Sequence, residues 1–163
     1  MKNFNWTEFT RKIAIKAKLS TLYDAWTKSA ELEKWFLSKA VYVDQLNNPI
    51  DKNANAFKGF SYTWNWYLYD GTETAKVIEA NGKDLLRFIF VGCNVDVKLY
   101  QQGDSVIVEL KQYNIPTDDE SKKSIRLGCD SGWSFYLLNL KSIYEGGIDL
   151  RNKDAEFKGL VNN

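Results

Sequence analysis

The sequence predicts an α+β fold in which a curved antiparallel sheet wraps around one long C-terminal helix, with two short helices after the first strand. Three observations lead to this prediction. Patterns of alternating apolar and polar residues recur from residue 9 to residue 113, and their connections are too short for parallel crossovers. Two short helical patterns follow the first of these strands. A single longer helical pattern follows the last, and it alone has the length to cover a sheet.

The first strand is predicted over Phe9–Ile15, where large or aliphatic side chains alternate with smaller or polar ones. Two short helices follow. Ser20 or Thr21 is expected to cap the first helix and Ser29 the second, because side-chain oxygens accept hydrogen bonds from the free N–H groups at helix starts. The apolar positions of these helices, three to four residues apart, are Leu22, Tyr23, Trp26, Leu32, Trp35 and Phe36.

Six further strands are predicted. Ala40–Asp44 is a short strand, and residues 45–59, which contain Asn, Pro and Gly without periodicity, are predicted to form a loop. The next strand enters at Gly59 and carries five bulky residues on one face, namely Phe60, Tyr62, Trp64, Trp66 and Leu68. Asp70-Gly71 favours a two-residue hairpin because both positions tolerate positive φ. The stretches TETAKVIEA, DLLRFIFVG, NVDVKLYQQ and DSVIVELKQY complete an antiparallel meander.

The long helix is predicted over residues 117–146. Pro116 precedes the pattern Thr117-x-x-Glu120, which is typical of a capping box, and Gly146-Gly147 provides the stop. The apolar positions Cys129, Trp133, Tyr136, Leu137, Leu140 and Tyr144 recur at helical spacing.

The composition excludes several classes of function. With 22 basic and 21 acidic residues and a net charge of +1, the chain lacks the basic surface that binds nucleic acid. The absence of histidine removes histidine-based catalysis and most zinc or iron sites. Cys93 and Cys129 form no CxxC motif and are expected to be reduced and buried, so no cofactor or metal is predicted. No signal peptide or membrane span is recognised. We therefore expect one cytoplasmic domain over residues 1–163.

Four stretches occur in an order that resembles a known family. They are LSTLYDAWTKSAELEKWF, KGFSYTW, DGTETAKVIEANGKDLLRFIF and GWSFYLLNLKSIYEGG. Together they resemble the activator-of-heat-shock-protein-ATPase-like branch of the START, or SRPBCC, superfamily, to which the birch-pollen-allergen-like proteins also belong. The resemblance spans residues 9 to about 150, with departures at Lys58 and at Ser29-Ala30. It implies a helix-grip fold with an apolar cavity between sheet and helix, closed at one end by the short helix pair.

The aromatic residues expected near this cavity are the candidate site. They either line a ligand cavity or fill it. The predicted site residues are Trp35, Phe36, Tyr62, Trp64, Trp66, Phe88, Phe90, Trp133 and Leu137. The function predicted from them is a binding module for a small hydrophobic or amphipathic molecule. The alternative is a chaperone-associated or other protein-interaction domain, with a role in the stress response. A cyclase-like or hydrolase-like enzyme is disfavoured because no acid and base pair is recognised. The oligomeric state is left open.

Other residues have two possible roles. We expect the backbone of Gly132, inside the long helix, to approach the strands closely, the alternative being room for a ligand. Arg87 and Asp96 are expected on a solvated outer face, the alternative being that they face inward if the strand register differs. Residues 47–57 are expected to form a surface connection, the alternative being a lid over the cavity entrance. Four tyrosines either orient a ligand or bond to the backbone, and they are Tyr62, Tyr113, Tyr136 and Tyr144.

Overall fold

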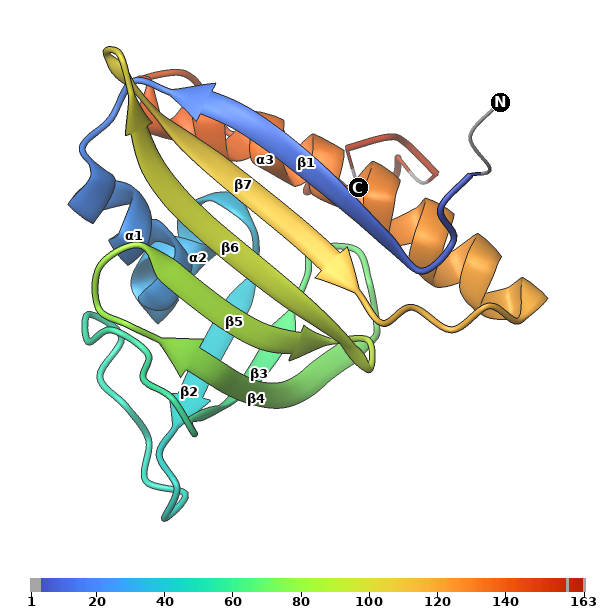
Figure 1. Cartoon of the computed structure of the whole chain (residues 1–163), viewed down its shortest axis with the longest axis horizontal. Helices are drawn as coiled ribbons and strands as arrows, with labels where there is room; N and C mark the ends of the chain where they lie inside the picture. Colours follow the sequence, from blue (N-terminus) through green and yellow to red (C-terminus); the bar gives the residue numbers. More distant parts are fainter. Residues whose placement is uncertain (1–3, 158, 163) are drawn as a thin grey trace.

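Seven strands form one antiparallel sheet in the computed structural model, which describes residues 4–157 and 159–162 (Figure 1). The strands are β1 (Glu8–Ile15), β2 (Lys39–Val43), β3 (Ser61–Asn65), β4 (Thr72–Ala80), β5 (Leu85–Phe90), β6 (Cys93–Gln102) and β7 (Ser105–Tyr113). Their order is β1-β7-β6-β5-β4-β3-β2, so the first strand pairs with the last. The predicted meander is confirmed. Residues 1–3, 158 and 163 of the expected domain lie outside the described part of the chain.

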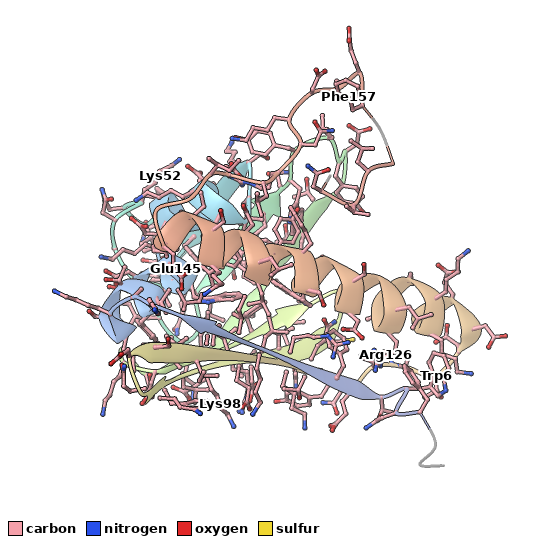
Figure 2. All side chains as sticks on the ribbon, turned by 90° about the horizontal axis from the view of Figure 1, so that it is seen from above. Trp6, Lys52, Lys98, Arg126, Glu145 and Phe157 are labelled. Atoms are coloured by element: carbon pink, nitrogen blue, oxygen red, sulfur yellow. The ribbon has the colours of Figure 1, made fainter. Side chains whose placement is uncertain are left out.

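The helices cover the inner face of this sheet. The short helices α1 (Leu19–Thr27) and α2 (Ser29–Trp35) join β1 to β2, and the long helix consists of a π-helical part, η1 (Ser121–Cys129), followed directly by α3 (Asp130–Tyr144). Figure 2 shows the long helix on one side of the sheet, with side chains filling the space between them and Lys98 on the opposite side. The helix-grip prediction is confirmed.

The alternation of apolar residues explains why β6 and β7 face the helix with one side. The inward side chains are all at most 4% exposed, and they are Val95, Val97, Leu99, Val106, Val108 and Leu110. Each buried side chain of this kind contributes about 1.5–3 kcal/mol to folding. The intervening positions on the outer face are mostly polar, so the period of the sequence determines which side of these strands faces the helix.

The strand β3 ends earlier than predicted. It stops at Asn65, which pairs with Thr72, so a six-residue loop replaces the predicted two-residue hairpin. Leu68 lies in this loop with a φ of 58° and is 39% exposed. The alternation of aromatic residues in the sequence thus continues to Trp66, although the strand has already ended at Asn65. The ring of Trp66 still packs inward, against Phe36 at a ring-centroid distance of 5.5 Å.

The predicted helix caps are wrong. Ser20 and Ser29 lie inside α1 and α2, whose N-cap residues Lys18 and Lys28 make no side-chain cap hydrogen bond. At α2, the N–H of Ala30 instead donates to a backbone carbonyl of the 45–59 loop, 3.0 Å away. A remote carbonyl thus replaces the local hydroxyl.

The long helix starts later than predicted, with residues 119 and 120 already helical ahead of η1, and it ends at Tyr144. Asp118, rather than Thr117, caps it, since the Asp118 carboxylate accepts the N–H of Ser121 at 2.9 Å. A carboxylate is the stronger acceptor at the positive end of the helix dipole.

Arg87 and Asp96 lie on the outer face, as expected, but Asp96 is not solvated there. It is 6% exposed, and the Arg87 guanidinium donates to both of its oxygens at 2.6 and 2.7 Å. Tyr113 donates a third hydrogen bond, at 3.2 Å. Burial alone would raise the pKa of Asp96, but the bonds from Arg87 outweigh it and hold that pKa below its usual value.

The chain after α3 folds back onto α2. The buried guanidinium of Arg151 donates to the carbonyls of Leu37 and Lys34, both at 2.9 Å, and of Glu33 at 3.1 Å. It also stacks over the ring of Tyr67, 5.2 Å from its centroid. Within the described residues, none of the helices has both the length and the apolar composition needed to cross a membrane.

Candidate functional site, an aromatic cavity under the long helix

A cavity with a volume of about 480 Å³ lies between the long helix, the 66–71 loop and the turn that joins β5 to β6. It is lined by Phe36, Trp66, Tyr67, Leu68, Tyr69, Gly71, Thr72, Glu73, Phe90, Val91, Ser124, Gly128, Cys129, Gly132, Trp133 and Tyr136. Residues 45–59 do not contribute to this lining. That loop is therefore a surface connection and not a lid over the cavity.

Five aromatic rings form the floor of the cavity. Phe36 is central, with its ring centroid 5.1 Å from Trp133, 5.5 Å from Trp66 and 4.8 Å from Tyr136. Phe90 closes the set, 5.1 Å from Trp133. Rings in tilted or edge contacts at these distances stabilise one another and resist collapse, so the floor is rigid.

The helical wall is open because two glycines face it. A Cβ built at Gly132 meets no atom within 4 Å, and one built at Gly128 meets only the carbonyl oxygen of Lys123, at 3.6 Å. The expected close contact between Gly132 and the strands is therefore wrong. The alternative, that glycine leaves space, describes the structure. Because residues four apart share one face of a helix, the two glycines leave a strip of that face without side chains opposite the rings.

The rim of the cavity holds two unusual backbone conformations. Leu68 and Val91 have φ values of 58° and 45°, a region that residues other than glycine rarely adopt. Both are more than a third exposed, and Tyr69 beside them is 65% exposed. Glu73 holds one side of the rim, since its carboxylate accepts the N–H of Val91 at 2.8 Å. Strained backbone of this kind clusters at functional sites.

The predicted site residues divide into two layers. Phe36, Trp66, Phe90 and Trp133 line the cavity. The other five pack behind it and are at most 3% exposed, and they are Trp35, Tyr62, Trp64, Phe88 and Leu137. The rings thus both line and fill the interior. Tyr67, Tyr69, Glu73 and Cys129 were missed as lining residues, and the spacing of the two glycines on the helix is the sequence signal that points to this face.

Polar groups behind the floor fix its rings. The indole N–H of Trp133 donates to the side-chain oxygen of the buried Gln112 at 2.9 Å, and the indole N–H of Trp35 donates to the carbonyl of Ala25 at 3.0 Å. Tyr62 donates to the carbonyl of Ile89. These bonds prevent the rings from rotating into the empty volume.

Most of the four tyrosines singled out from the sequence have hydroxyls that bond to other residues. Tyr144 donates to Glu31 at 2.6 Å, and Tyr113 donates to Asp96. Tyr136 differs, because its hydroxyl makes no hydrogen bond to another residue in the described part of the chain. Burial raises the pKa of Tyr136 to about 12, against a smaller opposing effect of Arg151, so the hydroxyl remains a neutral donor at physiological pH.

The reactive side chains of the cavity are few. Burial raises the pKa of Cys129 to about 11, with Gln112 opposing it, so the thiol is protonated and a weak nucleophile. Among residues 4–157 and 159–162, no group of three or more acidic or cysteine side chains could hold a metal ion. The arrangement is suited to binding an apolar molecule and excluding water from it.

Comparison with known proteins identifies the family of this chain. The family model described as "Activator of Hsp90 ATPase homolog 1-like protein" matches residues 16–145. The chain belongs to this family. The resemblance in the sequence to the heat-shock-protein-ATPase-activator branch of the START, or SRPBCC, superfamily is thereby confirmed. The comparison with curated protein sequences gives no match.

Solved structures share the fold at low sequence identity. A crystal structure from Staphylococcus saprophyticus has a TM-score of 0.69 and 13% identity, and the match covers 88% of this chain and 96% of that one. The solution structure of the Aha1 dimer from Colwellia psychrerythraea has a TM-score of 0.63 and 20% identity, with 86% and 97% covered. A crystal structure from Mesorhizobium loti has a TM-score of 0.66 and 13% identity, with 85% and 97% covered.

Proposed function

We propose that the chain is a binding protein for a small apolar or amphipathic molecule, held between the sheet and the N-terminal half of the long helix. The observation that carries this proposal is the cavity of about 480 Å³ with its floor of five aromatic rings. Small-molecule sites in proteins are mostly apolar clefts of roughly 300–1,000 Å³ with a few polar groups, as here. Family membership supports a ligand-binding or chaperone-associated domain in general terms.

Some residues of the site would contact the ligand, and others support the residues that do. Phe36, Trp66, Phe90, Trp133 and Tyr136 provide the surface for a ligand, and Gly132 leaves room for it on the helix side. The five predicted residues that pack behind the cavity, Trp35 and Trp64 among them, hold these rings in place. An apolar ligand would gain from burial against the rings without first having to order them.

The experiment uses N-phenylnaphthylamine, a neutral apolar dye whose emission rises in an apolar site. We expect saturable binding with one dye per chain. Gly132→Leu should weaken it at least about tenfold, or 1.4 kcal/mol, because the leucine side chain would occupy the open space beside the rings. The melting temperature should not fall, since leucine is a better helix former than glycine and an added Cβ at this position meets no atom within 4 Å.

Ser131→Leu is the matched control, because Ser131 is the preceding residue of the same helix but is exposed and outside the cavity. It should bind the dye like the wild type. Equal binding by the Gly132→Leu variant would place the dye elsewhere and contradict the proposed site. If a broad set of apolar compounds gives no saturable signal with the wild type, the rings only fill the interior. The chaperone-associated alternative is then favoured.

A further inference from the structure

We infer that the cavity selects a cationic ligand, an ammonium group carried on an apolar body, and that the carboxylate of Glu73 is its counter-ion. This inference rests on the proposed function, since it names the class of molecule that the same cavity binds. Three features support it: the face of the sheet on which Glu73 lies, the lack of a charged partner for its carboxylate among the described residues, and the aromatic residues that line the same cavity.

Glu73 lies on the inner face of the sheet. It is the second residue of β4 and pairs directly with Trp64 of β3. Side chains opposite each other on antiparallel strands project to the same face, and Trp64 is 1% exposed beneath the helix. Among the described residues that line the cavity, Glu73 is the one with a charged side chain.

The charge of Glu73 is not neutralised by another side chain. One carboxylate oxygen accepts the N–H of Val91, at 2.8 Å. Within the part of the chain that the structure describes, Glu73 forms no ion pair with a lysine or arginine. Glu73 is half-buried, so a cation that enters the cavity would meet a carboxylate with no competing counter-ion among the described residues.

Aromatic rings line the same cavity as this carboxylate. The rings of Trp66 and Phe90 are 6.0 Å apart, and Phe90 is 5.1 Å from Trp133. The faces of such rings carry negative electrostatic potential and attract ammonium groups, most strongly where water is excluded. Proteins commonly recognise quaternary ammonium compounds through such rings, and here one carboxylate lines the cavity with them.

Two cations lie near the outer edge of the cavity and must be weighed against Glu73. Arg151 and Lys153 stack over the ring of Tyr67, at 5.2 and 5.0 Å from its centroid. Both also pair with Asp149, at 2.7 and 2.9 Å. Their charges are therefore partly balanced by that carboxylate, whereas Glu73 has no charged partner among the described residues.

The test compares three small compounds by titration of tryptophan emission. Phenyltrimethylammonium is the cation, tert-butylbenzene is its neutral equivalent of the same shape, and benzenesulfonate is an anion of similar size. Glu73→Gln should weaken binding of the cation about tenfold and change binding of tert-butylbenzene less than about twofold. The glutamine oxygen can still accept the N–H of Val91, so the rim should keep its conformation.

Glu79→Gln is the matched control, because it removes a carboxylate from the same strand but outside the cavity. It should leave all three affinities unchanged. Equal cation binding by wild type and Glu73→Gln would overturn the inference. So would an equal loss of both ligands in that variant, which would mean that Glu73 only supports the wall.

The wild type alone also decides the question, whether or not the variant folds. Benzenesulfonate binding more tightly than phenyltrimethylammonium would overturn the inference, since it would show a positive site. In each of these cases, saturable binding of N-phenylnaphthylamine leaves the proposed function standing. Failure of that dye and of all three compounds would overturn both proposals.

Discussion

At the scale of single residues, Gly132 shows a conflict between helix stability and an open cavity. Glycine inside a helix is less favourable than alanine because it loses more backbone freedom on folding. Its missing side chain is also what leaves the space opposite the rings of Trp133 and Phe90. A residue that costs stability while keeping volume open is expected where a ligand must enter.

Gly132→Ala should therefore raise the free energy of unfolding by about 1 kcal/mol, because alanine is the better helix former and its Cβ meets no neighbour. Urea denaturation measures this change. Gly147→Ala is the contrasting variant, because there an added Cβ would lie 2.9 Å from the carbonyl oxygen of Ser142. A loss of stability in Gly132→Ala would contradict the open space at this position.

The Asp96 carboxylate predicts a pH dependence of stability. Its pKa is lower in the folded chain than in the unfolded chain, where it is about 3.9, so the unfolded chain takes up the proton first as the pH falls. The stabilisation is thus present above about pH 4 and is lost as the pH falls through the folded-state pKa. Asp96→Asn should cost about 1–2 kcal/mol at pH 7, at the low end for bonds to charged groups because Arg87 is partly exposed.

Melting curves between pH 7 and pH 2 test this dependence. The wild type should lose melting temperature toward low pH, and the Asp96→Asn variant should lose less over the same range. The exposed Asp104 serves for comparison, since Asp104→Asn removes a carboxylate that forms no ion pair among the described residues. Parallel curves for wild type and Asp96→Asn would show that this carboxylate does not contribute.

At the scale of elements, the long helix has two unequal halves. Its π-helical part, residues 121–129, buries only Arg126, whereas α3 buries Trp133, Leu137, Asn139 and Leu140. Backbone hydrogen bonds in a π-helix are also less favourable than in an α-helix, and short π segments recur at functional sites. Both halves contribute residues to the cavity wall, and the π-helical half is the less stable of the two.

Hydrogen exchange should reveal this difference. We expect the amides of residues 121–129 to exchange about tenfold faster or more than those of residues 133–144. Bound N-phenylnaphthylamine should slow exchange in the first segment, because Ser124, Gly128 and Cys129 line the cavity. Equal protection of the two halves in the free protein would contradict the contrast drawn from burial.

Elements were predictable where a period of apolar residues determines burial. The strands β5, β6 and β7 follow the alternation closely, since one side of each faces the helix. The end of β3 was not predictable, because the aromatic alternation continues through Trp66 while the backbone turns away to place this ring against Phe36. The α2 cap was missed because its partner is a carbonyl of the distant 45–59 loop.

The candidate site was predictable only in part for a similar reason. Residue type and spacing identify which rings face inward, and all nine predicted residues lie in the interior. Whether a ring lines space or fills it depends on what the opposite element lacks. In this protein the missing side chains of Gly128 and Gly132 leave the rings opposite them next to open space. This space can be recognised only once the positions of the helix and the sheet relative to each other are known.

At the scale of the whole molecule, the segment after α3 connects the short helices, the long helix and the cavity. Asn139 of α3 donates to the carbonyl of Trp35 at 2.6 Å and accepts the N–H of Leu150 at 2.7 Å. Arg151 then donates to the last carbonyls of α2 and stacks on Tyr67, which lines the cavity. Beyond it, Phe157 lies away from the sheet in Figure 2. The segment lies outside the family match, which ends at residue 145.

Arg151→Lys should therefore lower the free energy of unfolding by about 2–4 kcal/mol, because one ammonium group cannot replace a buried planar guanidinium that donates to three carbonyls and to Asp149. Urea denaturation measures the loss. Lys153→Ala is the control: Lys153 also pairs with Asp149 and stacks on Tyr67, but its side chain is 47% exposed. It should cost less than about 1 kcal/mol.

If Arg151 holds the cavity wall through Tyr67, Arg151→Lys should also weaken the binding of N-phenylnaphthylamine, measured under conditions where the variant is fully folded. Unchanged stability and dye affinity would mean that this segment contributes neither to the fold nor to the cavity.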